Sequence, residues 1–149
     1  MKRNTRIVAA VIAGLASVIL AASTLCTWAI SYGASMRWRL LFRLLCHGIP
    51  NRCLEIWHVP MPICARCTAL YAGFLAGILL FMLLPRLQEM TARWILGLAA
   101  LPMLLDGITQ LATIRESTNP LRIETGLIAG AAFALWALSA VESHVLSTA

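Results

Sequence analysis

The chain has 149 residues, of which 60% are hydrophobic and 12% charged, and its mean hydropathy is +0.83. A soluble domain is usually about 45–50% apolar, and a soluble protein with so few charges would expose large apolar patches to water. This composition excludes a single soluble domain. It favours an all-α polytopic membrane protein that forms one membrane domain over residues 1–149.

The net charge is +6, from 12 Lys and Arg against 6 Asp and Glu. In a soluble protein this balance would suggest nucleic-acid binding. Here the arginines lie between apolar segments, where they meet lipid headgroups and help to set the orientation in the membrane. We therefore expect the lipid bilayer as a partner, and no nucleic acid.

Four apolar stretches are long enough to cross a bilayer, which takes about 20 residues of helix. A basic start precedes the first stretch, as in a cleaved signal peptide. The 26 uncharged residues of the first stretch, however, exceed the usual apolar region of a signal peptide and predict a transmembrane helix. The predicted spans are residues 7–32, 64–84, 94–113 and 120–141.

The segment between the first two spans, residues 36–63, predicts no further span. Over 36–47 arginines alternate with Trp, Phe and Leu, which predicts an amphipathic helix lying on the membrane surface. The glycine and prolines of 48–63 predict an ordered loop at the same surface.

Alternate connections of a four-span protein lie on the same side of the membrane. The 33–63 segment and the 114–119 loop therefore share one face with the start of the second span, the end of the third and the start of the fourth. Polar residues gather at these positions, and we expect them to converge in one site. They are Cys64, Arg66, Cys67, Gln110, Arg115, Asn119 and Arg122.

Basic residues divide almost evenly between the two faces. The face of the termini has five, which are Lys2, Arg3, Arg6, Arg86 and Arg93. The other face has seven, but four of them are candidates for the site, which leaves three, namely Arg37, Arg39 and Arg43. The positive-inside rule then places both termini in the cytoplasm and the site outside, in a bacterial-type cytoplasmic (inner) membrane.

Four of the five cysteines lie close together in the sequence. Cys64 and Cys67 form a CxxC pair at the start of a predicted helix, where the helix dipole and Arg66 stabilise a thiolate. Two sulfurs from such a pair supply half of a tetrahedral zinc site, and the upstream Cys-His pair can supply the rest. The predicted metal ligands, with zinc as the cofactor, are Cys46, His47, Cys64 and Cys67, with His58 as an alternative nitrogen ligand. Redox or structural thiols, and packing alone, are the alternatives.

A carboxylate, Asp106, lies inside the third predicted span. An ionisable group in a membrane is costly and by default functional, with a partner to be named. Gln110 follows one turn later on the same face, and we expect Asp106 to pair with Arg66 or Arg122. These residues are the catalytic candidates Asp106, Gln110 and Arg66; the alternative is a structural polar lock between helices.

Four motifs occur together over roughly residues 42–130. They are Cys46-His47-x-x-Pro50-x-Arg52, Pro62-x-Cys64-x-Arg66-Cys67-Thr68-x-x-Tyr71-x-Gly73, Asp106-Gly107-x-x-Gln110 and Glu116-Ser117-Thr118-Asn119-x-x-Arg122-x-x-Thr125-Gly126. Together they resemble the small predicted membrane proteins of domain-of-unknown-function family 2085. Gly48 stands where that family typically has Gln, and Cys53 where it typically has Ser. The resemblance supports a set of ligand-binding residues and implies no reaction; the set is Arg52, Tyr71, Asn119 and Arg122.

Three functional hypotheses fit these residues, and they leave open whether the protein is an enzyme. The first is a metal centre beside a site that binds or turns over a polar or lipid-phosphate group. The second is a thiol–disulfide oxidoreductase in which Cys64 attacks, Cys67 resolves and a quinone accepts electrons. The third is a non-enzymatic scaffold or transporter subunit that forms a homo-oligomer through GxxxG steps at Gly73/Gly77 and Gly126/Gly130.

Overall fold

Four long α-helices make up most of the protein, whose computed structural model describes residues 3–83, 87–112 and 115–147. They are α1 (Arg3–Ser31), α2 (Ala65–Leu83), α3 (Glu89–Leu111) and α4 (Asn119–Ser147). Each is long and apolar enough to cross a membrane, which confirms the predicted helical fold. The predicted span ends at 84 and 113 lie outside the described residues, as do Lys2 and Arg86.

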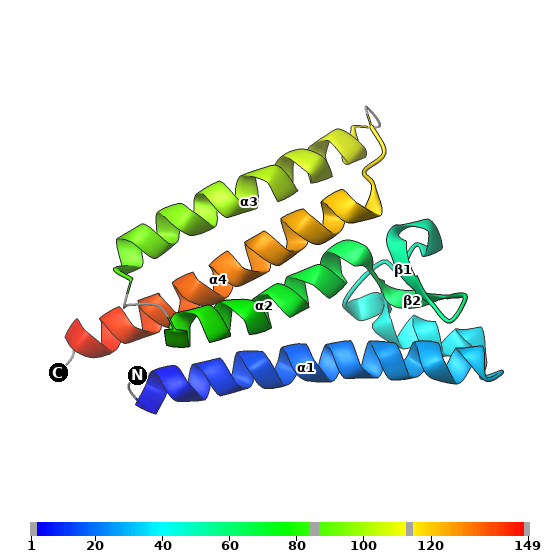
Figure 1. Cartoon of the computed structure of the whole chain (residues 1–149), viewed down its shortest axis with the longest axis horizontal. Helices are drawn as coiled ribbons and strands as arrows, with labels where there is room; N and C mark the ends of the chain where they lie inside the picture. Colours follow the sequence, from blue (N-terminus) through cyan, green and yellow to red (C-terminus); the bar gives the residue numbers. More distant parts are fainter. Residues whose placement is uncertain (1–2, 84–86, 113–114, 148–149) are drawn as a thin grey trace.

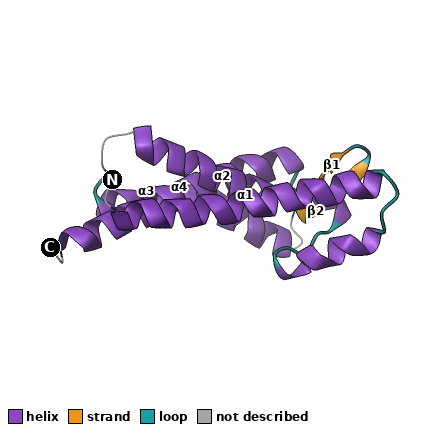
Figure 2. Ribbon diagram, turned by 90° about the horizontal axis from the view of Figure 1, so that it is seen from below, coloured by secondary structure: helices purple, strands orange, loops and turns teal. Residues whose placement is uncertain are grey.

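The four helices lie side by side in the order α1, α2, α4, α3 (Figure 1). Both chain ends lie at one end of this bundle, and the segment between α1 and α2 lies at the other (Figures 1 and 2). Residues 115–118, which precede α4, lie at that second end as well (Figure 1). The arrangement confirms that the two connections expected on one face lie at one end of the bundle.

Small residues let α2 and α4 approach closely. A Cβ at Gly130 of α4 would meet the carbonyl oxygen of Leu70 and lie 3.2 Å from the Cα of Gly73 in α2. A Cβ at Gly126 would lie 2.6 Å from the carbonyl oxygen of Arg66. The two GxxxG steps therefore pack α2 against α4 within one chain. They are covered by the chain itself, so the surface that the scaffold hypothesis assigned to association is already in use.

Helix α3, at one edge of the bundle, has few buried residues. Only Ala92 and Asp106 are buried in it, while leucines such as Leu98 are exposed. An exposed apolar face of this kind suits lipid as the surrounding solvent. Asp106 is therefore the one charged residue of α3 that the described structure buries, and it faces the rest of the bundle.

A 3₁₀ helix, η1 (Met36–Leu44), follows α1. The Ser35 hydroxyl caps it by accepting a hydrogen bond from the backbone N–H of Arg37 at 3.3 Å. The expected helix of 36–47 is thus present as a 3₁₀ helix that ends at Leu44, so that Cys46 and His47 lie beyond it. Its exposed side chains include Trp38 and Leu44.

The segment 48–63, for which the sequence predicts an ordered loop, contains a β-hairpin. A short 3₁₀ turn, η2 (Pro50–Arg52), leads into β1 (Cys53–Ile56), which pairs antiparallel with β2 (Val59–Cys64). Prolines in β2 argued against a strand, but a two-stranded sheet has only edge strands, where a missing N–H is tolerated. The register places Cys53 opposite Cys64, at the point where β2 runs directly into α2.

Candidate functional site

Three cysteine sulfurs converge where the hairpin meets the helices. The Sγ atoms of Cys46, Cys64 and Cys67 all lie within 4.8 Å of one another. A zinc–sulfur distance of about 2.3 Å in a tetrahedron separates two sulfurs by about 3.8 Å, so this spacing suits one ion. Within the part of the chain that the structure describes, the group that meets this spacing does not include His47.

Each sulfur comes from a different local element. Cys46 follows η1, Cys64 is the last residue of β2, and Cys67 lies in the first turn of α2. Backbone N–H groups already point at the sulfurs: that of Cys64 donates to Cys46 Sγ at 3.3 Å, and that of Cys67 to Cys64 Sγ at 3.5 Å. Such donors stabilise thiolates, the form that binds a metal.

Arg39 holds the Cys46 segment against the hairpin. Its guanidinium donates to the carbonyl oxygens of Gly48, at 3.3 Å, and of Met61, at 3.0 Å. Gly48 has a φ of +55°, a conformation that favours glycine. The sequence placed Arg39 only among the surface arginines, because nothing local marks its reach to residue 61.

Hydrogen bonds among the clustered cysteines shift the pKa values of their thiols in opposite directions. Hydrogen bonds from the side chains of Cys64 and Cys67 lower the pKa of the Cys46 thiol. The same interaction with Cys46 raises the pKa of the Cys64 thiol. Burial raises the pKa of Cys53 to about 11, so Cys53 stays a neutral thiol at neutral pH.

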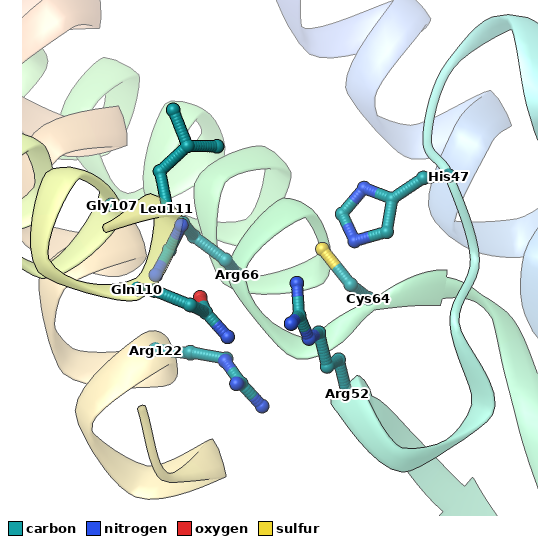
Figure 3. Close-up of a pocket in the computed structure, with 8 residues that line it drawn as sticks. All are labelled: His47, Arg52, Cys64, Arg66, Gly107, Gln110, Leu111 and Arg122. Carbon is teal, nitrogen blue, oxygen red and sulfur yellow. The ribbon is translucent and has the colours of Figure 1, made fainter. Parts of the chain in front are cut away.

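A cavity of about 420 Å³ opens beside the sulfurs (Figure 3). It lies between the hairpin and the nearest ends of α2, α3 and α4 (Figure 3). Three of its lining side chains are arginines. Figure 3 shows His47 and Cys64 on one side of it, opposite Gln110 and Arg122. The lining residues are His47, Arg52, Cys64, Arg66, Gly107, Gln110, Leu111 and Arg122.

Two of these arginines meet at one amide. With its amide oriented toward them, the Gln110 oxygen accepts from Arg52 at 3.2 Å and from Arg122 at 2.9 Å. Arg122, only 5% exposed, also donates to the side-chain oxygen of Asn119 at 2.8 Å. Asn119 in turn donates to the Cys53 carbonyl at 3.3 Å. Among the described residues neither Arg52 nor Arg122 has a carboxylate partner, so two positive charges face the cavity unneutralised.

The third arginine is paired with the buried carboxylate. Arg66 donates to Asp106, as expected, and Arg115 donates to the other carboxylate oxygen at 3.0 Å. The Ser117 hydroxyl adds a third donor at 2.7 Å. Ser117 was not among the predicted site residues, because a serine in a turn and a serine in a site look alike in sequence. Asp106 therefore holds Arg66 and the 115–118 segment in place.

A sequence profile described as "Predicted membrane protein (DUF2085)" matches residues 46–136, more than half of the chain. The chain belongs to this family. The match begins at Cys46 and includes every proposed ligand and every charged residue of the cavity, whereas α1 and η1 lie outside it. The match therefore covers the hairpin, the residues that line the cavity, α2, α3 and α4 as far as residue 136.

Two relatives of this DUF2085 chain come from archaea. An uncharacterised protein of Methanocaldococcus jannaschii is 40% identical over 92 residues, which is 60% of this chain and 59% of the relative. One of Methanothermobacter thermautotrophicus is 36% identical over 105 residues, or 70% of this chain and 93% of the relative. This chain thus spans less than two thirds of the first relative. No solved structure matches it.

The residues predicted for the site fall into three groups. Most line the cavity or the sulfur cluster. Asp106 and Asn119 are outside the cavity lining and hold Arg66 and Arg122 in place. Tyr71 packs against the apolar side of the cysteine cluster, with Phe42 and Ile63, and is not among the cavity's lining residues. His47 lines the cavity beside Cys64, and its role as a metal ligand stays a prediction.

Proposed function

We propose that this membrane protein holds a thiolate-bound metal ion, with zinc the best fit, beside an arginine cavity that binds an oxyanion. Cys46, Cys64 and Cys67 supply three ligands, and the fourth position is open to His47 or to a group in the cavity. The observation that carries the proposal is the convergence of three sulfurs, one of which belongs to a residue that also lines the arginine cavity.

The same convergence favours a metal over a thiol–disulfide oxidoreductase. Disulfide exchange needs two thiols and a path for a third to attack. Here three sulfurs surround one point, and backbone N–H groups support two of them. Soft thiolate ligands in such an arrangement select zinc or a similar ion.

The arginines of the cavity support the proposed binding of an oxyanion. Arg122 is buried and, like Arg52, has no carboxylate counterpart within the described chain. A guanidinium offers a planar fork of donors that matches phosphate and carboxylate oxygens. Arg66 is held in the same wall by Asp106, which acts as a positioning residue. In this arrangement a lipid phosphate or a smaller oxyanion neutralises the cavity.

Elemental analysis of detergent-purified protein tests the metal centre. We expect about one equivalent of zinc per chain in the unaltered protein and a loss of most of it in Cys46→Ser and Cys67→Ser, since each removes one of three ligands. Cys53→Ser is the matched control, because this buried neutral thiol lies next to the cluster but outside the ligand group. Less than about a tenth of an equivalent of zinc or iron in the unaltered protein contradicts the proposal.

A further inference from the structure

The sulfur cluster and the arginine cavity are contiguous, which bears on the fourth metal position. Three thiolates at the corners of a tetrahedron leave one corner free, and catalytic zinc sites keep that corner open. Apolar side chains, including Phe42 and Ile63, pack around the cysteines. Cys64 belongs to this apolar cluster and also forms part of the polar cavity wall. A polar ligand in the cavity therefore has direct access to the cluster.

The charges around the cavity indicate which net charge such a ligand carries. A doubly charged ion with three thiolates has a net charge of −1, and Arg52 with Arg122 adds +2. Arg66 and Asp106 cancel, and Arg115, which is half exposed, adds a further charge screened by water. With Arg115 counted, the charges in and around the cavity sum to +2, so a dianion neutralises them and a monoanion leaves one positive charge.

Resting on the proposed metal centre, we infer that the cavity binds a phosphate monoester or free phosphate as the dianion, with one of its oxygens as the fourth metal ligand. Arg52 and Arg122 take the remaining oxygens through charge-assisted hydrogen bonds, displacing the shared contact with Gln110. His47 then lies beside the bound phosphate and does not occupy the metal. The two sources of such a group are a lipid with a terminal phosphate and inorganic phosphate.

Cobalt substitution makes the fourth ligand visible, because the visible absorption bands of Co²⁺ respond to its coordination. Purified protein carrying Co²⁺ is titrated with inorganic phosphate, with sodium chloride at equal ionic strength as the blank. We expect a saturable spectral shift with phosphate and no shift with chloride. Arg122→Gln and Arg52→Gln each raise the apparent Kd at least about tenfold, the scale of one charge-assisted hydrogen bond. Arg93→Gln, an exposed arginine paired with Glu89, leaves the Kd unchanged.

A second arm separates the sources of the phosphate. The cobalt protein is placed in lipid nanodiscs with phosphatidic acid, a monoester, or with phosphatidylglycerol, a diester that carries a single charge. A shift with phosphatidic acid at lower concentration than with inorganic phosphate assigns the lipid, and the reverse assigns the free ion. An equal shift with phosphatidylglycerol overturns the preference for a dianion.

The failures of the two proposals are distinguishable. If the protein binds neither zinc nor cobalt, the metal centre itself is wrong. If cobalt binds but phosphate leaves its spectrum unchanged while His47→Ala alters it, His47 is the fourth ligand and only the present inference fails. If one arginine variant does not fold, the other, on a different element, decides the role of the cavity.

Discussion

Asp106 is the residue whose surroundings differ most from those of an ordinary transmembrane position. Its side chain is 3% exposed and accepts from Arg66, Arg115 and Ser117, which come from two different segments. An ionised carboxylate is stable inside a bundle only when paired and hydrogen-bonded in this way. Removing one member of the network leaves the opposite charge buried and uncompensated.

We expect Asp106→Asn to lower the free energy of unfolding by about 3 kcal/mol, because it leaves Arg66 without its carboxylate. Glu89→Gln is the matched control: that carboxylate also accepts from an arginine and a serine, but its side chain is 25% exposed. Its loss costs no more than about 1 kcal/mol. Thermal unfolding of both variants in one detergent checks this, and equal shifts contradict a buried centre.

Arg122 differs from Asp106 in what its removal leaves behind. It donates to Gln110 and Asn119, which are neutral, so its loss strands no carboxylate. The sequence-based expectation allowed Arg122 as the partner of Asp106, and on that basis its removal would have been the more damaging change. The structure assigns the pairing to Arg66, which makes Arg122 the better probe of ligand binding.

At the scale of elements, the contact between α2 and α4 fixes where the cavity lies. Both helices have glycines in their facing surfaces, and each contributes an arginine to the cavity from its first turn. Close backbone approach therefore brings Arg66 and Arg122 toward the same space. A side chain inserted in this contact would move the two helices apart.

A pair of glycine substitutions tests this contact. Gly130→Ala places a methyl group against the backbone of α2 and costs about 1–3 kcal/mol of stability, the range for overpacking. Gly97→Ala, in α3 with nothing within 4 Å of the added carbon, is neutral or stabilises by about 0.5–1 kcal/mol, because alanine favours helix. Unfolding measured under identical conditions distinguishes them; a neutral Gly130→Ala means that the helices do not meet here.

The whole molecule has two unlike ends. The termini and the start of α3 lie at one end, and the hairpin, the sulfur cluster and the arginine cavity at the other (Figure 1). If the helices cross the membrane, the site lies at one surface only. Outside the site, the sequence has more basic residues near the termini end than near the site end, which predicts that the termini end faces the cytoplasm.

Labelling from one side of the membrane tests this orientation. Tyr32 is 78% exposed after α1, at the site end, and Arg93 is exposed near the start of α3, at the other end. A membrane-impermeant maleimide is expected to label Tyr32→Cys in intact cells and Arg93→Cys only after permeabilisation, with the native cysteines as background. The reverse pattern contradicts the orientation, and labelling of both from one side contradicts the two-ended arrangement.

The sequence by itself determined the helices and the composition of the site. Hydropathy over about 20 residues decides whether a segment enters lipid, so the four spans and the sharing of one face by alternate connections could be predicted. The number of spans also predicted that Cys64, Arg66, Gln110 and Arg122 lie at one end of the bundle. A partner for Asp106 could be predicted because an isolated charge in a span is too costly.

Only the tertiary structure decided which of these groups meet. The hairpin was missed because its two prolines resemble loop residues, and edge pairing that tolerates them depends on the partner strand. Partner choice among several arginines depends on side-chain reach across helices, so the sequence could not select Arg66 over Arg122 for Asp106. The folded chain also places three sulfurs together and His47 on the cavity wall beside Cys64, where its role as a metal ligand stays a prediction.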